Sequence, residues 1–197
     1  AVAPVPTCRA LLFAALGLAI GACATEPRNF LTGDALVLVN GTLIAGTGAP
    51  PLPDAALVIR GERIVFAGRR AQVTISADAD VVDVGGATIL PGFIDAHVHG
   101  AYSAITLSAW ARAGVTTVRD EGIQQTGAVL RDLIALRDTA WNAPGYARLV
   151  SAGWMITAPG GYGRFYVSTA AEARARVNEE LDQGADLIKV AVEDGTT

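Results

Sequence analysis

The side chains of His97 and His99 are the residues of this 197-residue chain whose type and spacing point most directly to chemistry, and the sequence contains no other histidine. They close the apolar run Ile89–Ala96, which predicts a β-strand. On a strand, residues i and i+2 share a face, so both imidazoles point the same way while Val98 points oppositely. Two neutral imidazoles on one face suit a zinc-type ion, although a strand end can also carry two histidines by chance.

A single lysine, Lys189, interrupts the apolar segment Asp186–Val192, which predicts another strand. Leu187 and Ala191 would share its face of that strand. Burying an ammonium group without a partner costs several kcal/mol, so something must compensate its charge. Exposure at the strand end or pairing with a carboxylate are the plain alternatives to a chemical role.

The elements before the histidine pair are short and rich in β-forming residues. Strands are predicted at Ala35–Asn40, Ala56–Arg60, Arg63–Ala67 and Val81–Val84. Glycine-containing turns separate them, and Gly61 favours a tight hairpin between the second and third strands. These strands alone make an incomplete sheet.

After His99 the pattern changes to strands that alternate with helices, which indicates parallel βα units. Ser103 is a predicted N-cap, and Thr169 with Glu172 forms a predicted capping box. In chain order we expect a helix from Ser103 to Ala113, a strand at Val115–Arg119, a helix at Thr126–Arg137, a strand at Ala147–Ser151, a helix from Thr169 to Gln183 and the strand that carries Lys189.

The composition excludes some classes of partner. With 51% hydrophobic and 17% charged residues, the chain can bury a sizeable core. Its net charge of −4, its sequence pI of about 5.1 and the absence of a Lys/Arg cluster argue against binding to nucleic acid.

The first 22 residues have the composition of an export signal. Arg9 precedes an apolar run, residues 10–20, that is short for a membrane span but suits a secretory signal. The next residues, Ile-Gly-Ala-Cys, resemble a bacterial lipobox, which implies lipid attachment at Cys23. Residues 1–22 would then be the signal peptide, residues 23–33 a tether to the bacterial membrane, and the periplasmic side of the outer membrane the location. An ordinary signal peptide or a buried helix is the alternative.

The segment from Val81 to Gly100, VVDVGGATILPGFIDAHVHG, resembles the start of the barrel in the metal-dependent amidohydrolase superfamily. The likeness is close there and extends more loosely from about Ala35 to Thr197. It implies an α/β fold, the N-terminal half of a (β/α)₈ TIM-type barrel preceded by part of a small β-sandwich. Residues 34–90 would form the sandwich part, and residues 91–197 the first four βα units.

The resemblance also implies a metal site. His97 and His99 would bind one or two divalent ions, with zinc expected, and Lys189 would bridge them as N6-carboxylysine. The residues Gly184–Lys189 match the G-A-D-x-I-K context of that lysine in the family. Formation of this carbamate is chemically reasonable. Desolvation and nearby cations favour the neutral amine of a lysine, and the neutral amine attacks carbon dioxide to give a carbamate.

The sequences around two further residues resemble those of one branch of the family. This branch contains the imidazolonepropionase-like and the prolyl or arginyl dipeptidase-like enzymes. The string T-T-V-R-D ends at Asp120, which would lie at the carboxyl end of a barrel strand, in the substrate pocket. A helix cap or an ion pair with Arg119 or Arg131 explains it equally well. The glycine-rich loop Ile156–Gly163 carries Tyr162 where histidine is common, which implies a substrate contact or a plain linking loop.

The implied activity is metal-dependent hydrolysis of carbon–nitrogen bonds in small amides or peptides, of a dipeptidase-like kind. A cyclic-amide hydrolase or deaminase of the same superfamily is one alternative, and a non-catalytic, surface-anchored binding lipoprotein is another. No catalytic residue is expected in this chain, because the family's general-base aspartate belongs to a later strand. We therefore expect an N-terminal part that is inactive alone, with an unpaired sheet edge that favours association or oligomers.

Overall fold

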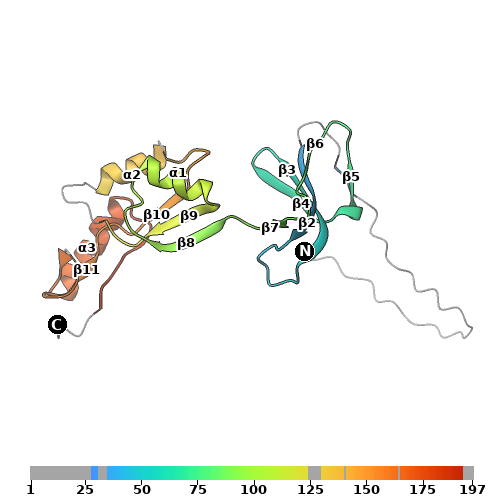
Figure 1. Cartoon of the computed structure of the whole chain (residues 1–197). Helices are drawn as coiled ribbons and strands as arrows, with labels where there is room; N and C mark the ends of the chain where they lie inside the picture. The colour runs from blue at the N-terminus through green and yellow to red at the C-terminus, as the bar shows by residue number, and fades with distance from the viewer. Residues whose placement is uncertain (1–27, 31–34, 124–129, 140, 164, 193–197) are drawn as a thin grey trace, which may run out of the picture. The chain divides into compact units, whose positions relative to one another are not determined.

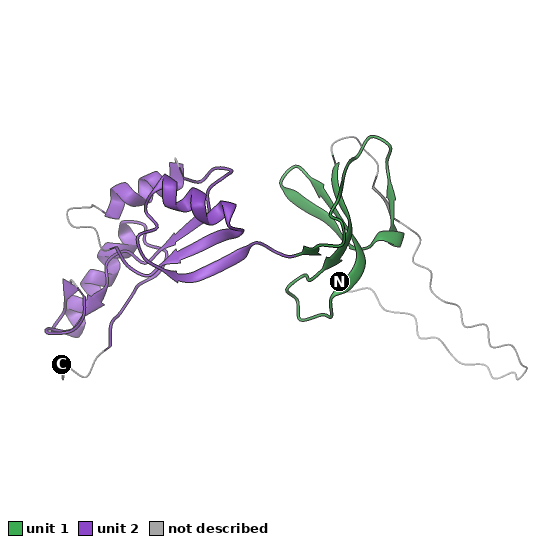
Figure 2. Ribbon diagram, viewed as in Figure 1, with its two compact units in different colours: residues 1–89 green, residues 90–197 purple. Residues whose placement is uncertain are grey.

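The computed structural model (Figure 1) describes residues 28–30, 35–123, 130–139, 141–163 and 165–192. It divides into two compact units, residues 1–89 and 90–197 (Figure 2). The expected signal peptide, the lipidation site Cys23 and the start of the expected tether lie outside the described residues. In the part that is described, no helix is long and apolar enough to cross a membrane.

Unit 1 is built from β-strands around the central strand β2. Its elements are β1 (Arg28–Phe30), β2 (Ala35–Leu43), β3 (Leu52–Arg60), β4 (Arg63–Arg69), the 3₁₀ helix η1 (Arg70–Gln72), β5 (Val73–Ile75), β6 (Asp80–Asp83) and β7 (Thr88–Ile89). Strand β2 pairs antiparallel with β3 and parallel with β6 and β7, and β4 pairs antiparallel with β3. Strands β1 and β5 form a separate parallel pair.

The predicted strands of unit 1 are confirmed, and most are longer than expected. The hairpin between β3 and β4 pairs Arg60 with Arg63, and Gly61 takes a φ of 53° that glycine adopts without strain. Alternate residues of β2 face opposite clusters, with Val37 in one and Leu38 in the other. One assignment needs correction: residues 28–30, expected within a tether, pair with β5 as β1.

Unit 2 contains a parallel sheet whose strands are joined by helices. Its elements are β8 (Phe93–Val98), α1 (Ala104–Arg112), β9 (Val115–Asp120), α2 (Leu130–Thr139), β10 (Arg148–Ser151), β11 (Ile156–Thr157), β12 (Phe165–Tyr166) and α3 (Ala170–Asp182). The strand order is β10-β9-β8, all parallel. Helices α1 and α2 lie on one face of this sheet (Figure 1). The partial α/β barrel predicted from the sequence is therefore present.

The helix ends follow the capping residues that the sequence predicts. Ser103 caps α1 by accepting a hydrogen bond from the Thr106 backbone N–H at 3.1 Å. Thr169 caps α3 in the same way, through the Glu172 N–H at 3.1 Å. The Glu172 carboxylate reaches back to the Ser168 N–H at 2.7 Å, one residue earlier than a standard capping box.

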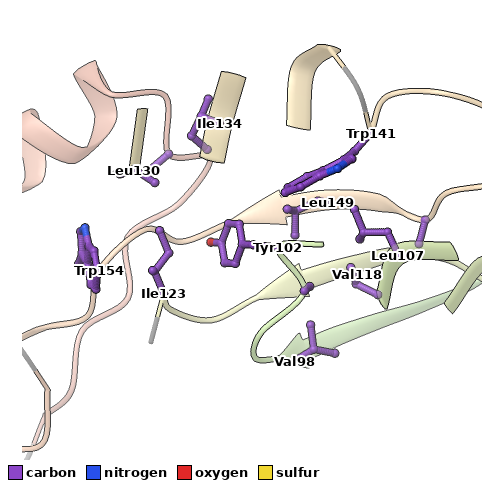
Figure 3. Packing of buried hydrophobic residues seen from close by; sticks show 13 residues of the cluster. Val98, Tyr102, Leu107, Val118, Ile123, Leu130, Ile134, Trp141, Leu149 and Trp154 are labelled. Atoms are coloured by element: carbon purple, nitrogen blue, oxygen red, sulfur yellow. The ribbon is translucent and has the colours of Figure 1, made fainter. Parts of the chain in front are cut away.

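The core of unit 2 fills the space between the sheet and its helices (Figure 3). Leu107 of α1 and Leu130 of α2 are buried against Val118 of β9 and Leu149 of β10. On β8, by contrast, Phe93 and Ile94 are exposed. The core therefore lies between the sheet and the helices that cover it, as expected for the outer layer of a barrel.

The expected fourth strand, Asp186–Val192, is not formed as a strand. The segment makes one isolated parallel bridge, Ile156 with Val190, and the Ile156 N–H donates to the Lys189 carbonyl at 2.9 Å. Strand β10 ends at Ser151, and Gly153 follows with a φ of 71°, which is not an extended-strand conformation.

Candidate functional site

The two histidines lie at the carboxyl end of β8, as the strand pattern requires. His97 is within the strand and His99 directly follows it. Their ring centroids are 5.4 Å apart, and the ring planes are inclined at 66°. Two imidazoles bound to one tetrahedral ion at about 2.1 Å would place their centroids roughly 5 Å apart. The separation of the two rings is therefore compatible with a single zinc-type ion.

The ring of His99 is oriented by the loop that follows β9. Its Nδ1 atom lies 3.4 Å from the carbonyl oxygen of Gly122. Because a carbonyl oxygen only accepts hydrogen bonds, this contact favours a proton on Nδ1. The other ring nitrogen, Nε2, is then the one with a lone pair for a ligand or metal.

His99 also forms part of the wall of a cavity of about 460 Å³. Tyr162, in the glycine-rich loop that the sequence singled out, lies on the same cavity. The other lining residues are Gly122, Ile123, Met155, Gly161, Gly163 and Tyr166. None of the described residues that line the cavity carries a carboxylate, an ammonium or a guanidinium group, so this part of the wall presents one imidazole amid neutral groups.

The positive charge of Lys189 is compensated by a carboxylate that sequence reasoning did not find. Its Nζ lies 3.6 Å from Glu121 Oε2, and the Lys189 side chain is 25% exposed. The other oxygen of Glu121 lies 2.6 Å from Arg119 Nε, in a second ion pair. The structure thus shows the pairing with a carboxylate that stood as an alternative for Lys189, while its role as a carboxylated metal ligand stays a prediction.

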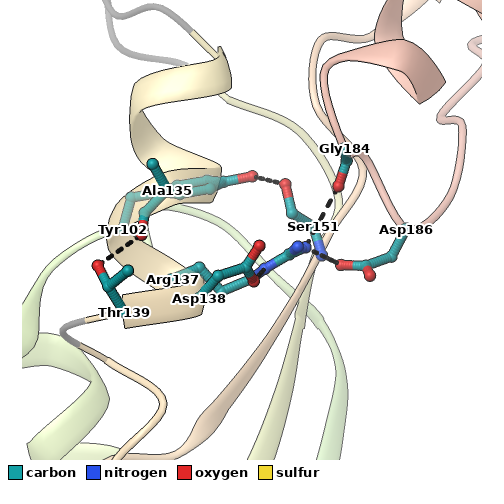
Figure 4. Close-up of polar contacts among 8 residues, drawn as sticks. All are labelled: Tyr102, Ala135, Arg137, Asp138, Thr139, Ser151, Gly184 and Asp186. Atoms are coloured by element: carbon teal, nitrogen blue, oxygen red, sulfur yellow. Dashed lines mark hydrogen bonds and ion pairs between the residues drawn. The ribbon is translucent and has the colours of Figure 1, made fainter.

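The segment that carries Lys189 is held at its start by Asp186 (Figure 4). One carboxylate oxygen of Asp186 accepts from Arg137 Nη1 at 2.5 Å and from the Ser151 backbone N–H at 2.9 Å. Arg137 is on α2 and Ser151 ends β10, so three elements meet at this carboxylate. A single side chain therefore fixes where the chain leaves α3 and runs toward Lys189.

Asp120 is completely buried and does not line the cavity. Its Oδ2 accepts from the Ala101 N–H at 2.8 Å, and its Oδ1 accepts from the Gly122 N–H at 3.0 Å. Burial raises the pKa of the Asp120 carboxyl above its usual range, and these two hydrogen bonds oppose the rise. Arg119, one of the alternative partners considered for Asp120, pairs with Glu121 instead.

The described residues hold only part of a metal-ligand set. Within those ranges, no group of three His, Cys, Asp or Glu side chains could bind one ion. The histidine pair fits a metal by its geometry, and a further ligand has to come from Lys189 or from outside the described residues.

Sequence reasoning missed Glu121, Tyr102 and Ser151. Glu121 was detectable, since it directly follows a strand whose carboxyl end was already assigned to the site. The hydrogen bond between the Tyr102 hydroxyl and Ser151 Oγ, 2.5 Å long and buried, joins residues 49 positions apart. No local sequence pattern indicates such a contact.

Comparisons with known proteins agree with this architecture. No protein-family model matches the sequence. Over 78 residues the chain is 40% identical to an adenine deaminase of Rubrobacter xylanophilus, covering 40% of this chain and 13% of that protein. Over 97 residues it is 34% identical to an imidazolonepropionase of Streptomyces griseus, covering 49% of this chain and 24% of that protein. The crystal structure of a prolidase complexed with N-methylphosphonate-L-proline matches with a TM-score of 0.63 and 27% identity, over 79% of this chain and 46% of that one.

The parallel βα units, with the histidine pair at the end of the first of their strands, define a partial α/β barrel. The sequence and structural matches agree with this architecture and support the resemblance to the amidohydrolase superfamily. The family resemblance and the fold class predicted from the sequence are both confirmed. The matched segments span a quarter or less of these two curated relatives, 13% and 24%.

Proposed function

We propose that the protein hydrolyses carbon–nitrogen bonds in small amides with the help of a divalent metal ion held by His97 and His99. The observation that carries this proposal is the histidine pair itself, with ring centroids 5.4 Å apart and one ring on the wall of the cavity. The relatives support it, since an adenine deaminase, an imidazolonepropionase and a prolidase all act on carbon–nitrogen bonds.

The residues of this chain would bind and orient the reactants. His99 would bind the ion through Nε2, because its Nδ1 faces the Gly122 carbonyl. When bound, the ion supplies Lewis acidity to a water molecule and to the scissile carbonyl. Lys189 would join the ligand set as a carbamate. That role requires its ammonium group to leave Glu121, lose a proton and react with carbon dioxide.

The neutral wall of the cavity favours an uncharged group next to the scissile bond. Ile123 and Met155 supply apolar surface, and Tyr162 and Tyr166 supply aromatic faces. A cationic substrate group would find no carboxylate among the described residues of this wall. Among dipeptide-like amides we therefore propose substrates that end in proline or another neutral residue, ahead of cationic ones.

Deamination is the second candidate, because the adenine deaminase match is 40% identical over 78 residues. A planar, uncharged base would suit the same cavity. The two candidates release different products, an amino acid or ammonia, and so one assay panel distinguishes them.

The test uses this chain and the protein translated from its complete reading frame, each loaded with zinc. Leu-Pro, Leu-Arg and adenine serve as substrates, with released amine and ammonia measured separately. In the protein from the complete reading frame we expect stoichiometric zinc and hydrolysis of Leu-Pro, both lost in the His97→Ala variant, whereas this chain alone should be inactive. Activity and zinc content that are unchanged in His97→Ala would refute the metal role of the pair.

We propose in addition that the protein is exported and lipid-anchored through Cys23, on the strength of the lipobox-like sequence alone. Expression in a Gram-negative host with a radiolabelled fatty acid tests this. We expect label in the parent and none in Cys23→Ser, and label retained in Cys23→Ser would contradict the assignment.

A further inference from the structure

Asp120 connects the two loops that surround His99. It ends β9, and its side chain has no solvent exposure. One oxygen accepts from Ala101, two residues beyond His99, and the other accepts from Gly122 in the loop after β9. A buried carboxylate is costly unless hydrogen bonds satisfy it, and here each oxygen receives a backbone N–H.

The backbone around Asp120 is fixed as well. The Ala152 N–H donates to the Asp120 carbonyl at 2.9 Å, and the Glu121 N–H donates to the Val98 carbonyl at 2.9 Å. These bonds hold the end of β9 between the ends of β8 and β10. The carboxylate therefore acts from a rigid position, as an accurately placed acceptor requires.

Gly122 connects Asp120 to the histidine. Its N–H donates to Asp120, and its carbonyl oxygen lies 3.4 Å from His99 Nδ1. Its φ of 138° is a conformation that glycine adopts readily and other residues rarely do. The orientation of this carbonyl thus depends on the local backbone that Asp120 holds.

We propose that Asp120 is a positioning residue that, through Gly122, holds His99 in the tautomer protonated at Nδ1 and so leaves Nε2 to bind metal. The part that concerns metal rests on the proposed function, whereas the part that concerns the tautomer does not. Carboxylates and carbonyls that orient a metal-binding histidine typically change metal affinity 10- to 100-fold when they are removed.

The chain is well suited to a direct test, because its two histidines give only two imidazole spin systems. Two-bond ¹H–¹⁵N spectra of the metal-free protein are recorded at about pH 8.5, well above the pKa of about 6.5 of a free imidazole. The His99→Gln variant assigns the rings. Asp120→Asn is the test variant, and Asp132→Asn, an exposed aspartate of α2, is the matched control.

We expect the His99 ring of the parent to show the pattern of the Nδ1-protonated tautomer. In Asp120→Asn the amide replaces one acceptor with a donor, so we expect a mixture of tautomers and a 10- to 100-fold loss of affinity for zinc ions in calorimetry. Asp132→Asn should match the parent in both measurements. Circular dichroism establishes that each variant is folded.

The result that would overturn the proposal is a parent His99 ring protonated at Nε2, or a folded Asp120→Asn protein with unchanged tautomer and zinc affinity. If Asp120→Asn does not fold, the parent spectrum still decides. If the parent shows the expected tautomer but binds no zinc, the proposed function fails while the positioning of His99 by Asp120 stands.

Discussion

Glu180 on α3 makes the stability of unit 2 depend on pH in an unusual direction. Its side chain is completely buried, and Oε1 lies 3.0 Å from Arg176 Nη2. Among the described residues Oε2 has no hydrogen-bond partner. Desolvation raises the pKa of the Glu180 carboxyl from 4.5 to about 7, against the opposing effect of Arg176.

The sign and size of the pH dependence of the free energy of unfolding follow from this pKa. Between pH 4.5 and about 7 the unfolded chain has released the Glu180 proton while the folded chain still holds it. The free energy of unfolding therefore falls as pH rises through this window, and this contribution is fully present only below pH 4.5. At about 1.4 kcal/mol per pH unit, the total loss is roughly 3 kcal/mol.

The Glu180→Gln variant removes the titration and keeps the shape of the side chain. We expect its free energy of unfolding, relative to the parent, to rise by roughly 3 kcal/mol from pH 4.5 to pH 8. Urea unfolding at several pH values, followed by tryptophan fluorescence, measures the difference. Other titrating groups contribute equally to both proteins and cancel.

Glu179→Gln is the matched control, because Glu179 is on the same helix and also pairs with Arg176, at 2.8 Å, but its side chain is 56% exposed. We expect its pH dependence to match the parent within about 0.5 kcal/mol. A Glu180→Gln curve parallel to that of the parent between pH 4.5 and pH 8 would show that the buried carboxyl does not titrate as argued.

Two further predictions concern packing in unit 2. Leu107→Ala should lower the free energy of unfolding by about 2–5 kcal/mol, because Leu107 is fully buried, whereas Ile105→Ala on the same helix, at 86% exposure, should change it by less than about 0.5 kcal/mol. Equal effects in urea unfolding would contradict the assigned face of α1. Gly184→Ala should cost more than about 1 kcal/mol, because Gly184 has a φ of 96° and an added Cβ would lie 2.8 Å from Ile134 Cγ2. A neutral effect in the same assay would be inconsistent with this helix end.

The elements that sequence reasoning predicted best are those set by local chemistry. The hairpin at Gly61 and the caps at Ser103 and Thr169 depend on a few neighbouring residues, and all three are present. The segment Asp186–Val192 has the composition of a buried strand, yet its pairing depends on the path of another segment beyond Ser151. Strand composition is local information, whereas strand pairing is not.

The candidate site likewise combines features that local sequence predicts with features that it does not. The spacing of His97 and His99 places both rings at one strand end, and two-residue periodicity is enough to predict it. Asp120 and Glu121 are adjacent in sequence and both lie at the carboxyl end of β9, but one bonds to backbone amides and the other to side-chain cations. Which of two neighbouring carboxylates faces the site depends on the side of the strand on which each side chain lies.

The surroundings of Lys189 determine the conditions under which it could carry a carbamate and bind metal. Glu121 compensates the ammonium form at 3.6 Å, and Arg119 holds the same carboxylate at 2.6 Å. A carbamate at Lys189 would be negative and would lie beside Glu121, so it requires a cation between or near the two groups. Carbamate formation and metal binding at His97 and His99 are therefore expected to occur together. In the metal-free chain the ion pair with Glu121 is the arrangement that satisfies both charges.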